Sequence, residues 1–328
     1  MILGTRAGYS QLSGCGLNLF TDSELAEMHR ATLDVLQNAG ILVMNEEARE
    51  IFYSHGCEVD KETNIVKIPP YLVEEAIQSA PSRLLLAARN PKYDIVLESN
   101  RVAYTCFGVA IEILDSETGK VRETTNKDLA ETAILADAAD GLDVYSMAAT
   151  PRDVPSEVED LTAAETSFVN CSKHFHHIDV LTTDGVRAFF EMGAAISGGA
   201  EEMKKRPIAS ILICPVSPMQ LSPECCEVIV ESAKLGIPCN VLSEALSGGT
   251  APVTTTGTLL THNAEVLGGI TLSQLTKKGA PVIYGSSTTM LDLTYVNAPV
   301  GAPELGMISA AVAKLAQYYN LPSYVAGT

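Results

Sequence analysis

Residues 209–242 read ASILICPVSPMQLSPECCEVIVESAKLGIPCNVL, and this stretch decides the expected fold. The apolar runs at 209–214 and 239–242 each have the length and composition of a buried strand. Between them, 223–234 has the apolar spacing of a helix, and Pro223 stands at its start, where proline is tolerated. A strand, a helix and a second strand in this order predict two parallel strands joined by a crossover helix.

The same alternation extends along the chain in both directions. The expected strands cover 144–148, 174–178, 209–214, 239–242, 282–284 and 323–325, and the expected helices cover 127–139, 157–170, 184–196, 223–234, 255–275 and 303–319. This order predicts an α/β fold that is either an open doubly wound sheet or a (β/α)8 barrel. We favour the barrel, because no glycine-rich dinucleotide fingerprint follows the first strand and because polar loops follow several strands.

The expected architecture is therefore an incomplete TIM (β/α)8-type barrel of about six strands. Residues 127–328 form the barrel portion, which lacks its last strands, and residues 1–126 form an N-terminal α+β cap region. Either two strands lie unrecognised in the first third, or the sequence is the front portion of a longer protein. Within the cap we expect helices at 23–38 (with Thr21 or Asp22 as N-cap), 46–54 and 70–79, a hairpin at 57–69, and short strands at 94–97, 102–107, 112–114 and 121–123.

The composition excludes several classes of protein. With 46% hydrophobic and 19% charged residues, the chain is too apolar to be disordered. Its formal net charge of −18 argues against nucleic-acid binding. We see no uninterrupted apolar run long enough for a membrane span and no signal peptide at the start, and the eight cysteines form no CxxC pair. Reduced thiols and a cytoplasmic location are expected.

The second strand carries three histidines that the strand period separates. His174 and His176 share one face, and His177 points to the other. Two imidazoles on one face can bind metal, contact a substrate or cofactor, or serve as hydrogen-bonded structural groups. No third metal ligand stands at a diagnostic spacing, so no metal is expected.

Small and polar residues follow the later strands. Gly248 and Gly249, with Gly285, would let a backbone approach a bulky ligand, or they simply form turns. The hydroxyl-bearing pocket candidates at the end of the fifth strand are Ser286, Ser287 and Thr288. No GxSxG elbow is present, so a serine nucleophile is not expected.

The helix at 255–275 carries an isolated charge. Glu265 is the one Asp, Glu, Lys or Arg between 245 and 276, and it stands beside Asn263. A lone carboxylate in an apolar helix is either paired internally or functional. Aromatic faces for a cationic group could come from Tyr284, Phe107 and Tyr104.

Long motifs across nearly the whole chain resemble one known family. The segments that carry the resemblance are 17–21 (LNLFT), 105–108 (TCFG), 173–179 (KHFHHID), 241–243 (VLS) with 247–249 (SGG), 260–267 (LTHNAEVL), 284–289 (YGSSTT), 298–301 (APVG) with 303–306 (PELG), and 324–328 (YVAGT). The chain thereby resembles the trimethylamine:corrinoid methyltransferase family, in its pyrrolysine-containing branch.

The resemblance implies a TIM barrel that transfers a methyl group from trimethylamine to cobalt(I) of a corrinoid, in methanogenesis or related one-carbon metabolism of methylamines. The resemblance also implies a cognate corrinoid protein that supplies the corrinoid, and the lack of an Asp-x-His-x-x-Gly motif in the sequence agrees with this. Members of this branch carry pyrrolysine directly after a Gly-Thr that matches Gly327 and Thr328, so the catalytic residue is expected at position 329. A chain that ends at Thr328 would be inactive by itself, and the full-length protein would form a homo-oligomer.

Three alternatives remain open. The first is a pyrrolysine-free relative that demethylates a quaternary amine such as glycine betaine. The second is an inactive truncated product. The third is an unrelated metal-dependent barrel hydrolase that uses His174 and His176.

Overall fold

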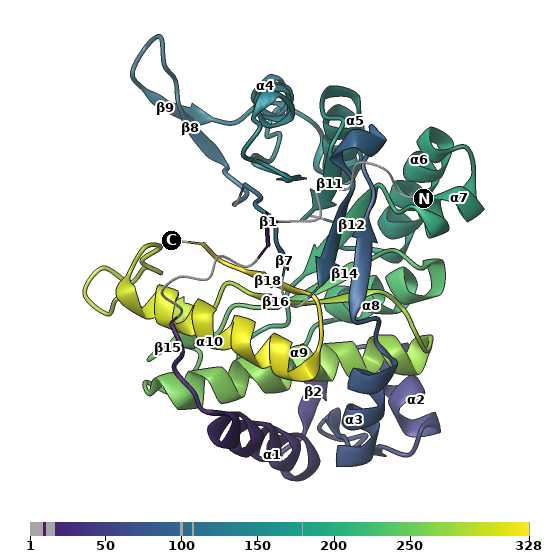
Figure 1. The fold of residues 1–328 in the computed structure, drawn as a ribbon, viewed down its shortest axis with the longest axis vertical. Coiled ribbons are helices and arrows are strands. Elements are labelled where there is room, and N and C mark those ends of the chain that lie inside the picture. The colour runs from purple at the N-terminus through teal and green to yellow at the C-terminus, as the bar shows by residue number, and fades with distance from the viewer. Residues whose placement is uncertain (1–8, 11–16, 99–100, 107, 179, 328) are drawn as a thin grey trace. The chain divides into compact units, whose positions relative to one another are not determined.

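The structure is a computed structural model that describes residues 9–10, 17–98, 101–106, 108–178 and 180–327. It divides into two compact units (Figure 1). Unit 1 comprises 84–212 together with 1–11, and unit 2 comprises 12–83 together with 213–328. Both units alternate helices with parallel strands.

Unit 1 contains three parallel strands, β10, β11 and β12, which pair in that order. Its elements are β1 (Tyr9–Ser10), β5 (Arg83–Leu86), η1 (Pro91–Tyr93), β6 (Ile95–Glu98), β7 (Arg101–Val102), β8 (Glu112–Leu114), β9 (Val121–Glu123), α4 (Asn126–Ala138), β10 (Val144–Ser146), η2 (Ser156–Val158), α5 (Glu159–Asn170), β11 (His174–His177), α6 (Thr183–Ser197), α7 (Ala200–Lys205) and β12 (Ala209–Ile213). Strands and crossover helices follow the order expected for a βαβ fold.

Unit 2 contains three further parallel strands, with β16 paired between β14 and β18. Its elements are α1 (Asp22–Asn38), β2 (Ile41–Val43), α2 (Glu46–Ser54), β3 (Glu58–Val59), β4 (Ile65–Lys67), α3 (Pro70–Ser79), β13 (Gln220–Leu221), α8 (Pro223–Leu235), β14 (Cys239–Ser243), β15 (Leu246–Ser247), α9 (Thr255–Thr276), β16 (Val282–Ser286), β17 (Thr289–Met290), α10 (Pro303–Tyr319) and β18 (Ser323–Val325). The predicted α/β fold with about six parallel strands is confirmed.

Helix boundaries follow local chemistry. Thr21 caps α1: its backbone N–H donates to Glu24 Oε2 over 2.7 Å, while its hydroxyl accepts from the Glu24 backbone N–H over 3.3 Å. This reciprocal pairing is a capping box, and it satisfies donors that the first turn leaves free. Helix α8 begins after the Ser222 cap and ends at Gly236, whose φ of 80° suits glycine.

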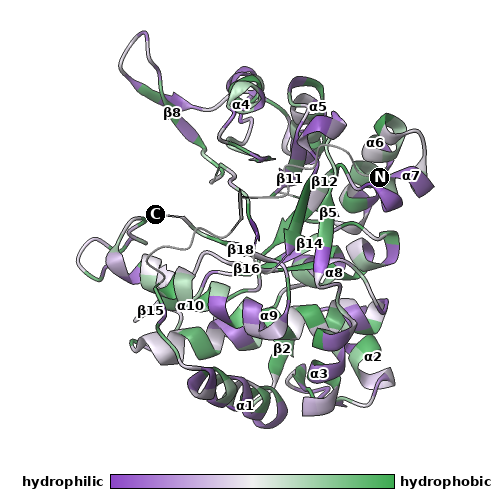
Figure 2. Ribbon diagram, in the orientation of Figure 1, coloured by the Kyte–Doolittle hydropathy of each residue, from purple (hydrophilic) through white to green (hydrophobic). Residues whose placement is uncertain are grey.

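The two faces of each parallel sheet have different neighbours. In unit 1, Phe175 of β11 packs against Phe168 of α5 and Phe189 of α6. On the opposite face, Val144 of β10 forms a buried cluster with Leu86 and Ile95. We call this opposite face of β10–β12 the inner face. Strands β12 and β14 are strongly apolar over most of their length (Figure 2).

Unit 2 shows the same two-sided burial. Every residue of β14 and β16 is buried. Val241 of β14 lies against Gly269 of α9, where an added Cβ would approach Val241 Cγ1 to 2.7 Å. We call this side of β14 and β16 the helix side. Because both sides of these strands are covered, their hydrophobic runs show no apolar–polar alternation.

The cap boundary between 126 and 127 stays a prediction, since each compact unit takes residues from both sides of it. Sequence reasoning missed the short helices η1 and α7 and the short strands β1, β2, β5, β13, β15 and β17. The seven cysteines within the described residues are free. No helix in the described part of the chain is long and apolar enough to cross a membrane.

Candidate functional site

The histidines of β11 divide between the two faces as predicted. His177 contacts Phe189 on the helix-covered face of unit 1, and its Nε2 lies 2.9 Å from the carbonyl oxygen of Asp160. His174 and His176 both reach the hydroxyl of Ser210 on β12, which faces the other way. The inner face therefore carries two imidazoles side by side.

Ser210 joins these two imidazoles in one hydrogen-bonded chain. Its Oγ lies 2.8 Å from His174 Nε2 and 2.7 Å from His176 Nδ1, and His174 Nδ1 lies 2.8 Å from the carbonyl oxygen of Ala87. Since a carbonyl can only accept, His174 Nδ1 carries a proton, and in the neutral ring Nε2 then accepts from Ser210. The serine oxygen in turn accepts from His176 Nδ1.

Both imidazoles are neutral at physiological pH. Burial lowers the pKa of His174 to about 4 and that of His176 to about 3, since a buried imidazole loses the hydration of its charged form. His174 uses both ring nitrogens in hydrogen bonds, so neither is open to a metal ion. Within the described residues, no group of three His, Cys, Asp or Glu side chains is placed to hold a metal.

The inner face carries a row of polar side chains across its three strands. Ser146, His176 and Ser210 stand in register across β10, β11 and β12. The Ser146 hydroxyl lies 2.9 Å from Thr105 Oγ1. We call Ser146, His176 and Ser210 the inner row. Sequence reasoning found His174 and His176 but missed Ser210 and Ser146, whose only signal was an alternating place within a predicted strand.

Tyr284 and Asn263 form a different polar chain on the helix side of β16. The Tyr284 hydroxyl donates to Asn263 Oδ1 over 2.6 Å. The Asn263 Nδ2 group donates to Tyr319 Oη and to Thr32 Oγ1, both over 2.8 Å. Burial raises the pKa of Tyr284 well above its usual range. These contacts hold α9 against α10, α1 and the sheet.

Glu265 is paired internally. Its Oε2 accepts from Ser217 Oγ over 2.8 Å and from Ser243 Oγ over 2.6 Å, and its Oε1 accepts from the Met219 backbone N–H over 2.9 Å. Burial raises the pKa of the Glu265 carboxyl, although these three donors act in the opposite direction. The side chain fastens α9 to the end of β14 and to the loop after β12.

Thr288 connects the hydroxyl cluster to His262. Its Oγ1 lies 3.1 Å from the Ser243 carbonyl oxygen, to which it donates, and it accepts from the Ala245 N–H over 3.3 Å. His262 Nδ1 lies 3.1 Å from Thr288 Oγ1. Because the one hydroxyl proton of Thr288 is already donated to Ser243, His262 Nδ1 must be the donor in this hydrogen bond. Burial lowers the pKa of His262 to about 3, so this ring is also neutral.

The remaining hydroxyls and glycines of the predicted mouth take part in turns and packing. Ser286 Oγ accepts from the Thr288 N–H over 3.1 Å, and the Ser287 N–H donates to the Ser243 carbonyl oxygen over 3.0 Å. Gly285 leaves space for a neighbour, because an added Cβ would meet Asn240 Oδ1 at 2.1 Å. Gly248 has a φ of 80°, which suits the turn after β15.

Gly249 lies against Leu291, and Tyr104 is largely exposed. Phe107 lies outside the described residues. The structure therefore brings the sequence candidates together as two groups. One group, His174 and His176, lies on the inner face of unit 1. The other lies in unit 2 and comprises Asn263, Glu265, Tyr284, Ser286, Ser287 and Thr288.

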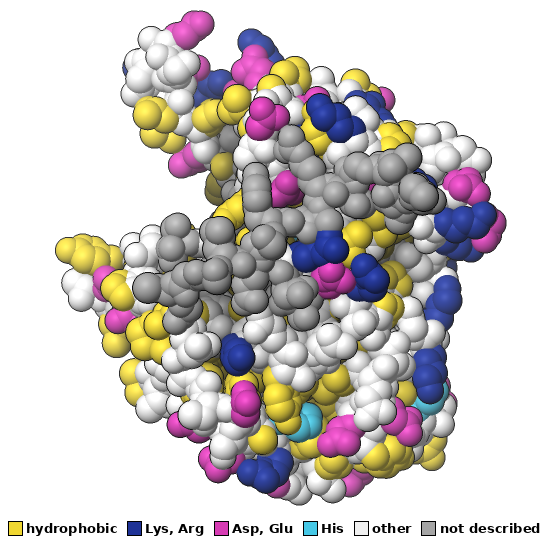
Figure 3. Space-filling view, in the orientation of Figure 1, with side chains coloured by type: hydrophobic (Ala, Val, Ile, Leu, Met, Phe, Trp, Pro, Cys, Tyr) yellow, Lys and Arg dark blue, Asp and Glu magenta, His cyan; other side chains and the backbone are white. Residues whose placement is uncertain are grey.

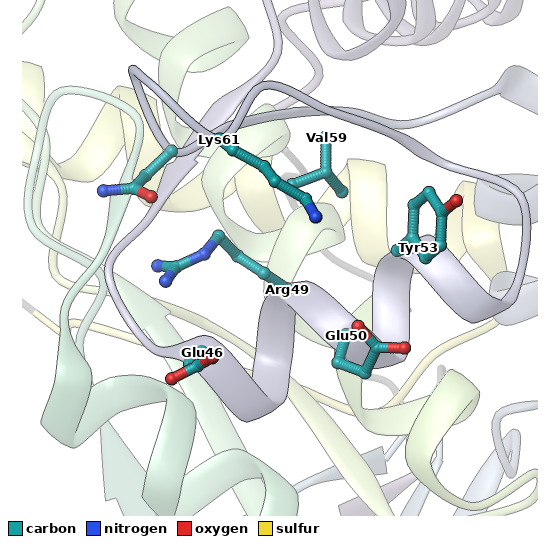
Figure 4. A pocket seen from close by; sticks show the side chains of 7 residues that line it. Glu46, Arg49, Glu50, Tyr53, Val59 and Lys61 are labelled. Carbon is teal, nitrogen blue, oxygen red and sulfur yellow. The ribbon is translucent and has the colours of Figure 1, made fainter.

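A surface pocket of about 220 Å³ lies in unit 2, beside α2 (Figure 4). Arg49 and Lys61 line it together with Glu46 and Glu50, so charges of both signs are mixed there. None of its lining residues belongs to either group of candidates, and its charges give it no preference for an anion or a cation.

Comparison with known proteins identifies the family. The family model described as trimethylamine methyltransferase (MTTB) matches residues 11–328. The chain belongs to this family. It is 50% identical over 327 residues to the trimethylamine methyltransferase MttB of Methanosarcina thermophila, covering 98% of this chain and 68% of the relative. The MttB of Desulfitobacterium hafniense is also 50% identical, over 98% of this chain and 65% of its own length.

A more distant relative carries another name. The glycine betaine methyltransferase of Desulfitobacterium hafniense is 29% identical, over 94% of this chain and 64% of its own length. The chain thus spans about two thirds of the length of these trimethylamine methyltransferase family members and of the betaine enzyme.

A solved structure supports the fold. The monomethylamine methyltransferase MtmB of Methanosarcina barkeri superposes with a TM-score of 0.52 at 10% sequence identity, covering 98% of this chain and 69% of that structure. At this identity the likeness concerns the fold, and it agrees with the barrel-type α/β architecture of the trimethylamine methyltransferase family member described here.

Proposed function

We propose that the whole protein transfers a methyl group from trimethylamine to the cobalt of a corrinoid that a partner protein carries. The observation that carries this proposal is the 50% identity to trimethylamine methyltransferases over 98% of the chain, against 29% to a glycine betaine methyltransferase. Differences in substrate between relatives arise from site residues, and sequence similarity of this extent favours the trimethylamine branch.

The reaction sets clear demands on the site. A corrinoid supplies a cobalt(I) nucleophile for a methyl carbon. The protein must hold the amine and the arriving cobalt in line, keep water away and lower the electron density on the amine nitrogen. The expected supply of the corrinoid by a partner agrees with His174, whose two ring nitrogens are both hydrogen-bonded within the chain and so are not available as an axial ligand.

We place the inner row in the part of the substrate site that this chain contributes. Ser146 is the last residue of β10 and His176 is the next to last of β11, at the carboxyl ends where parallel α/β barrels position their chemistry. Ser210, the second residue of β12, stands in register with His176. Trimethylamine is a cation when protonated, and two protonated imidazoles would repel it. Because burial keeps His174 and His176 neutral, the hydrogen-bonded chain through Ser210 adds no positive charge beside such a cation.

The position of pyrrolysine remains a prediction. Reading codon 329 of the gene tests it: an amber codon in frame supports pyrrolysine at that position, and an ordinary sense codon excludes it.

An assay of substrate choice tests the proposed activity. The full-length protein is mixed with its corrinoid protein in the cobalt(I) state, and methylation of cobalt is followed by its visible absorption spectrum. We expect methylation with trimethylamine at a rate at least about 100-fold above that with glycine betaine. Faster methylation with glycine betaine would replace this proposal by the quaternary-amine alternative, and no methylation with either amine would exclude both.

A further inference from the structure

The hairpin formed by β8 and β9 presents an unusual outer face. In its antiparallel register, Glu112 stands opposite Glu123 and Leu114 stands opposite Val121. Side chains two residues apart lie on the same face of a strand, so these four share one face. Leu114 is 66% exposed and Val121 is 63% exposed. Two apolar side chains in water therefore lie beside two opposed carboxylates.

The carboxylate pair costs stability within this chain. Like charges directly opposite each other on neighbouring strands repel. Neither Glu112 nor Glu123 makes a side-chain hydrogen bond or ion pair with any residue that the structure describes. A basic side chain from another molecule, placed between them, would relieve the repulsion.

The other face of the hairpin holds it in position. Arg122 donates from Nη1 and Nη2 to the two carboxylate oxygens of Asp128 on α4, over 2.7 and 2.8 Å, and from Nε to Asp115 over 3.1 Å. At the base, Thr124 Oγ1 donates to the Thr150 carbonyl oxygen over 2.6 Å. A bidentate ion pair fixes orientation as well as distance. The hairpin is thus a preorganised arm that extends away from α4 (Figure 1).

The arm starts at the carboxyl end of β10, the end of the parallel strands at which the catalytic site is expected. The Ala110 N–H donates to the carbonyl oxygen of Ala148, just beyond the last residue of β10, Ser146. Ser146 belongs to the inner row, so the arm rises from the carboxyl end of the same strand.

We propose that the corrinoid-carrying partner docks on this outer face. This proposal rests on the proposed function. Apolar and acidic side chains lie together on the projecting hairpin (Figure 3), so the partner's complementary surface carries lysine or arginine beside an apolar residue. A second copy of this chain docked by the same face would bring a second Glu112–Glu123 pair against the first. Charge therefore favours docking of a partner with a basic surface over a symmetric contact between two copies of this chain.

Matched charge reversals on the hairpin test the docking surface. Glu112→Lys and Glu123→Lys each reverse one carboxylate of the proposed face, and Glu117→Lys makes the same change in the turn of the same hairpin. Leu114→Ser is paired with Leu135→Ser, which alters an exposed leucine of α4. The full-length variants are compared for their Kd for the corrinoid protein, at low and high salt, and for their rate of cobalt methylation at saturating partner.

We expect Glu112→Lys, Glu123→Lys and Leu114→Ser each to weaken binding by about tenfold, with a reduced salt dependence for the two charge reversals. The saturated rate should stay at the parent value, and Glu117→Lys and Leu135→Ser should bind within about twofold of the parent. Parent-like affinity in the three face variants, or equal weakening in the two controls, would overturn the docking surface.

Failure of the two proposals can be told apart. A parent protein that binds the corrinoid protein but does not methylate its cobalt with trimethylamine contradicts the proposed function and leaves the docking result to the variants. A parent that methylates cobalt while the face variants bind normally contradicts the docking surface alone. A parent that does not bind the corrinoid protein contradicts both.

Discussion

Ser210 is the residue on which the inner face depends most. Its hydroxyl is the shared partner of two buried imidazoles, and it fixes which nitrogen of the His176 ring carries the proton. In the sequence, a serine within an apolar strand gives no sign of a functional role. Its importance follows from the register of β11 with β12, which aligns Ser210 with His176 and which no local pattern encodes.

Replacing Ser210 by alanine tests this network. Ser210→Ala leaves His174 Nε2 and His176 Nδ1 without their buried partner, so the free energy of unfolding should fall by about 1–3 kcal/mol. Ser167→Ala is the matched control: Ser167 Oγ is also buried in unit 1 and has no hydrogen-bond partner among the described residues, so its loss should change stability by less than about 0.5 kcal/mol.

Urea unfolding of the two full-length variants gives the comparison. Histidine ¹⁵N shifts provide a second readout, because Ser210→Ala should release the fixed tautomer of His176, whereas the Ala87 carbonyl should keep that of His174. Ser167→Ala should retain both. Equal stability losses in the two variants, together with an unchanged His176 tautomer in Ser210→Ala, would show that the hydroxyl does not organise the pair.

At the scale of elements, periodicity predicted most boundaries but not which face of a strand meets which neighbour. The spacing correctly separated His177 from His174 and His176. It could not show which face of β16 is the helix side, since both faces of a parallel strand are apolar and covered. Thr288, a pocket candidate at the end of the fifth strand, therefore bonds to His262 of α9.

Helix α9 shows a second limit of sequence reasoning. The isolated Glu265 was correctly singled out, and both readings, paired or functional, were open. Its partners Ser217, Met219 and Ser243 come from the loop after β12 and from the end of β14, far away in sequence. Only the folded chain shows that the three donors converge on one carboxylate.

Substitution of Glu265 tests its role as a fastening group. Glu265→Ala leaves the two serine hydroxyls and the Met219 N–H without an acceptor in a buried place, so it should destabilise the protein by about 3–5 kcal/mol. Glu265→Gln should cost less than about 1.5 kcal/mol, because its amide oxygen can accept from Met219 while the hydroxyls rotate to accept from its NH₂ group. Thermal unfolding at neutral pH measures both, and equal losses in the two variants would count against this role.

At the scale of the whole molecule, three buried neutral histidines make folding sensitive to acid. The pKa values of His174, His176 and His262 are about 4, 3 and 3 in the folded chain, below the ordinary 6.5. The unfolded chain therefore binds more protons between pH 6.5 and pH 3–4. Stability is fully present above pH 6.5 and is lost as pH falls through this window, at about 1.4 kcal/mol per pH unit for each histidine.

Comparison of pH dependence between variants isolates this effect. His176→Gln should lose stability less steeply than the parent between pH 6 and pH 4.5, because one of the three titrating groups is gone. Glu265, whose pKa is raised by burial, acts in the opposite direction but is present in both proteins. Parallel stability curves for parent and variant would mean that His176 does not titrate with this shift.

The family and the barrel-type fold were within reach of the sequence, because long motifs extend over nearly the whole chain and six helix–strand repeats cover residues 127–325. The assignment of polar groups to the inner row or to the helix side needed the folded structure. The folded structure separates the candidate residues into those proposed to face the substrate and those that hold α9 in place.

Locating the amine decides between these two faces most directly. A crystal structure of the full-length protein with bound tetramethylammonium, a stable mimic of the substrate cation, would show where the methyl groups lie. The account predicts the cation on the inner face, in contact with His176 and beside Ser210. A cation bound on the helix side, against Tyr284 and Asn263, would contradict it.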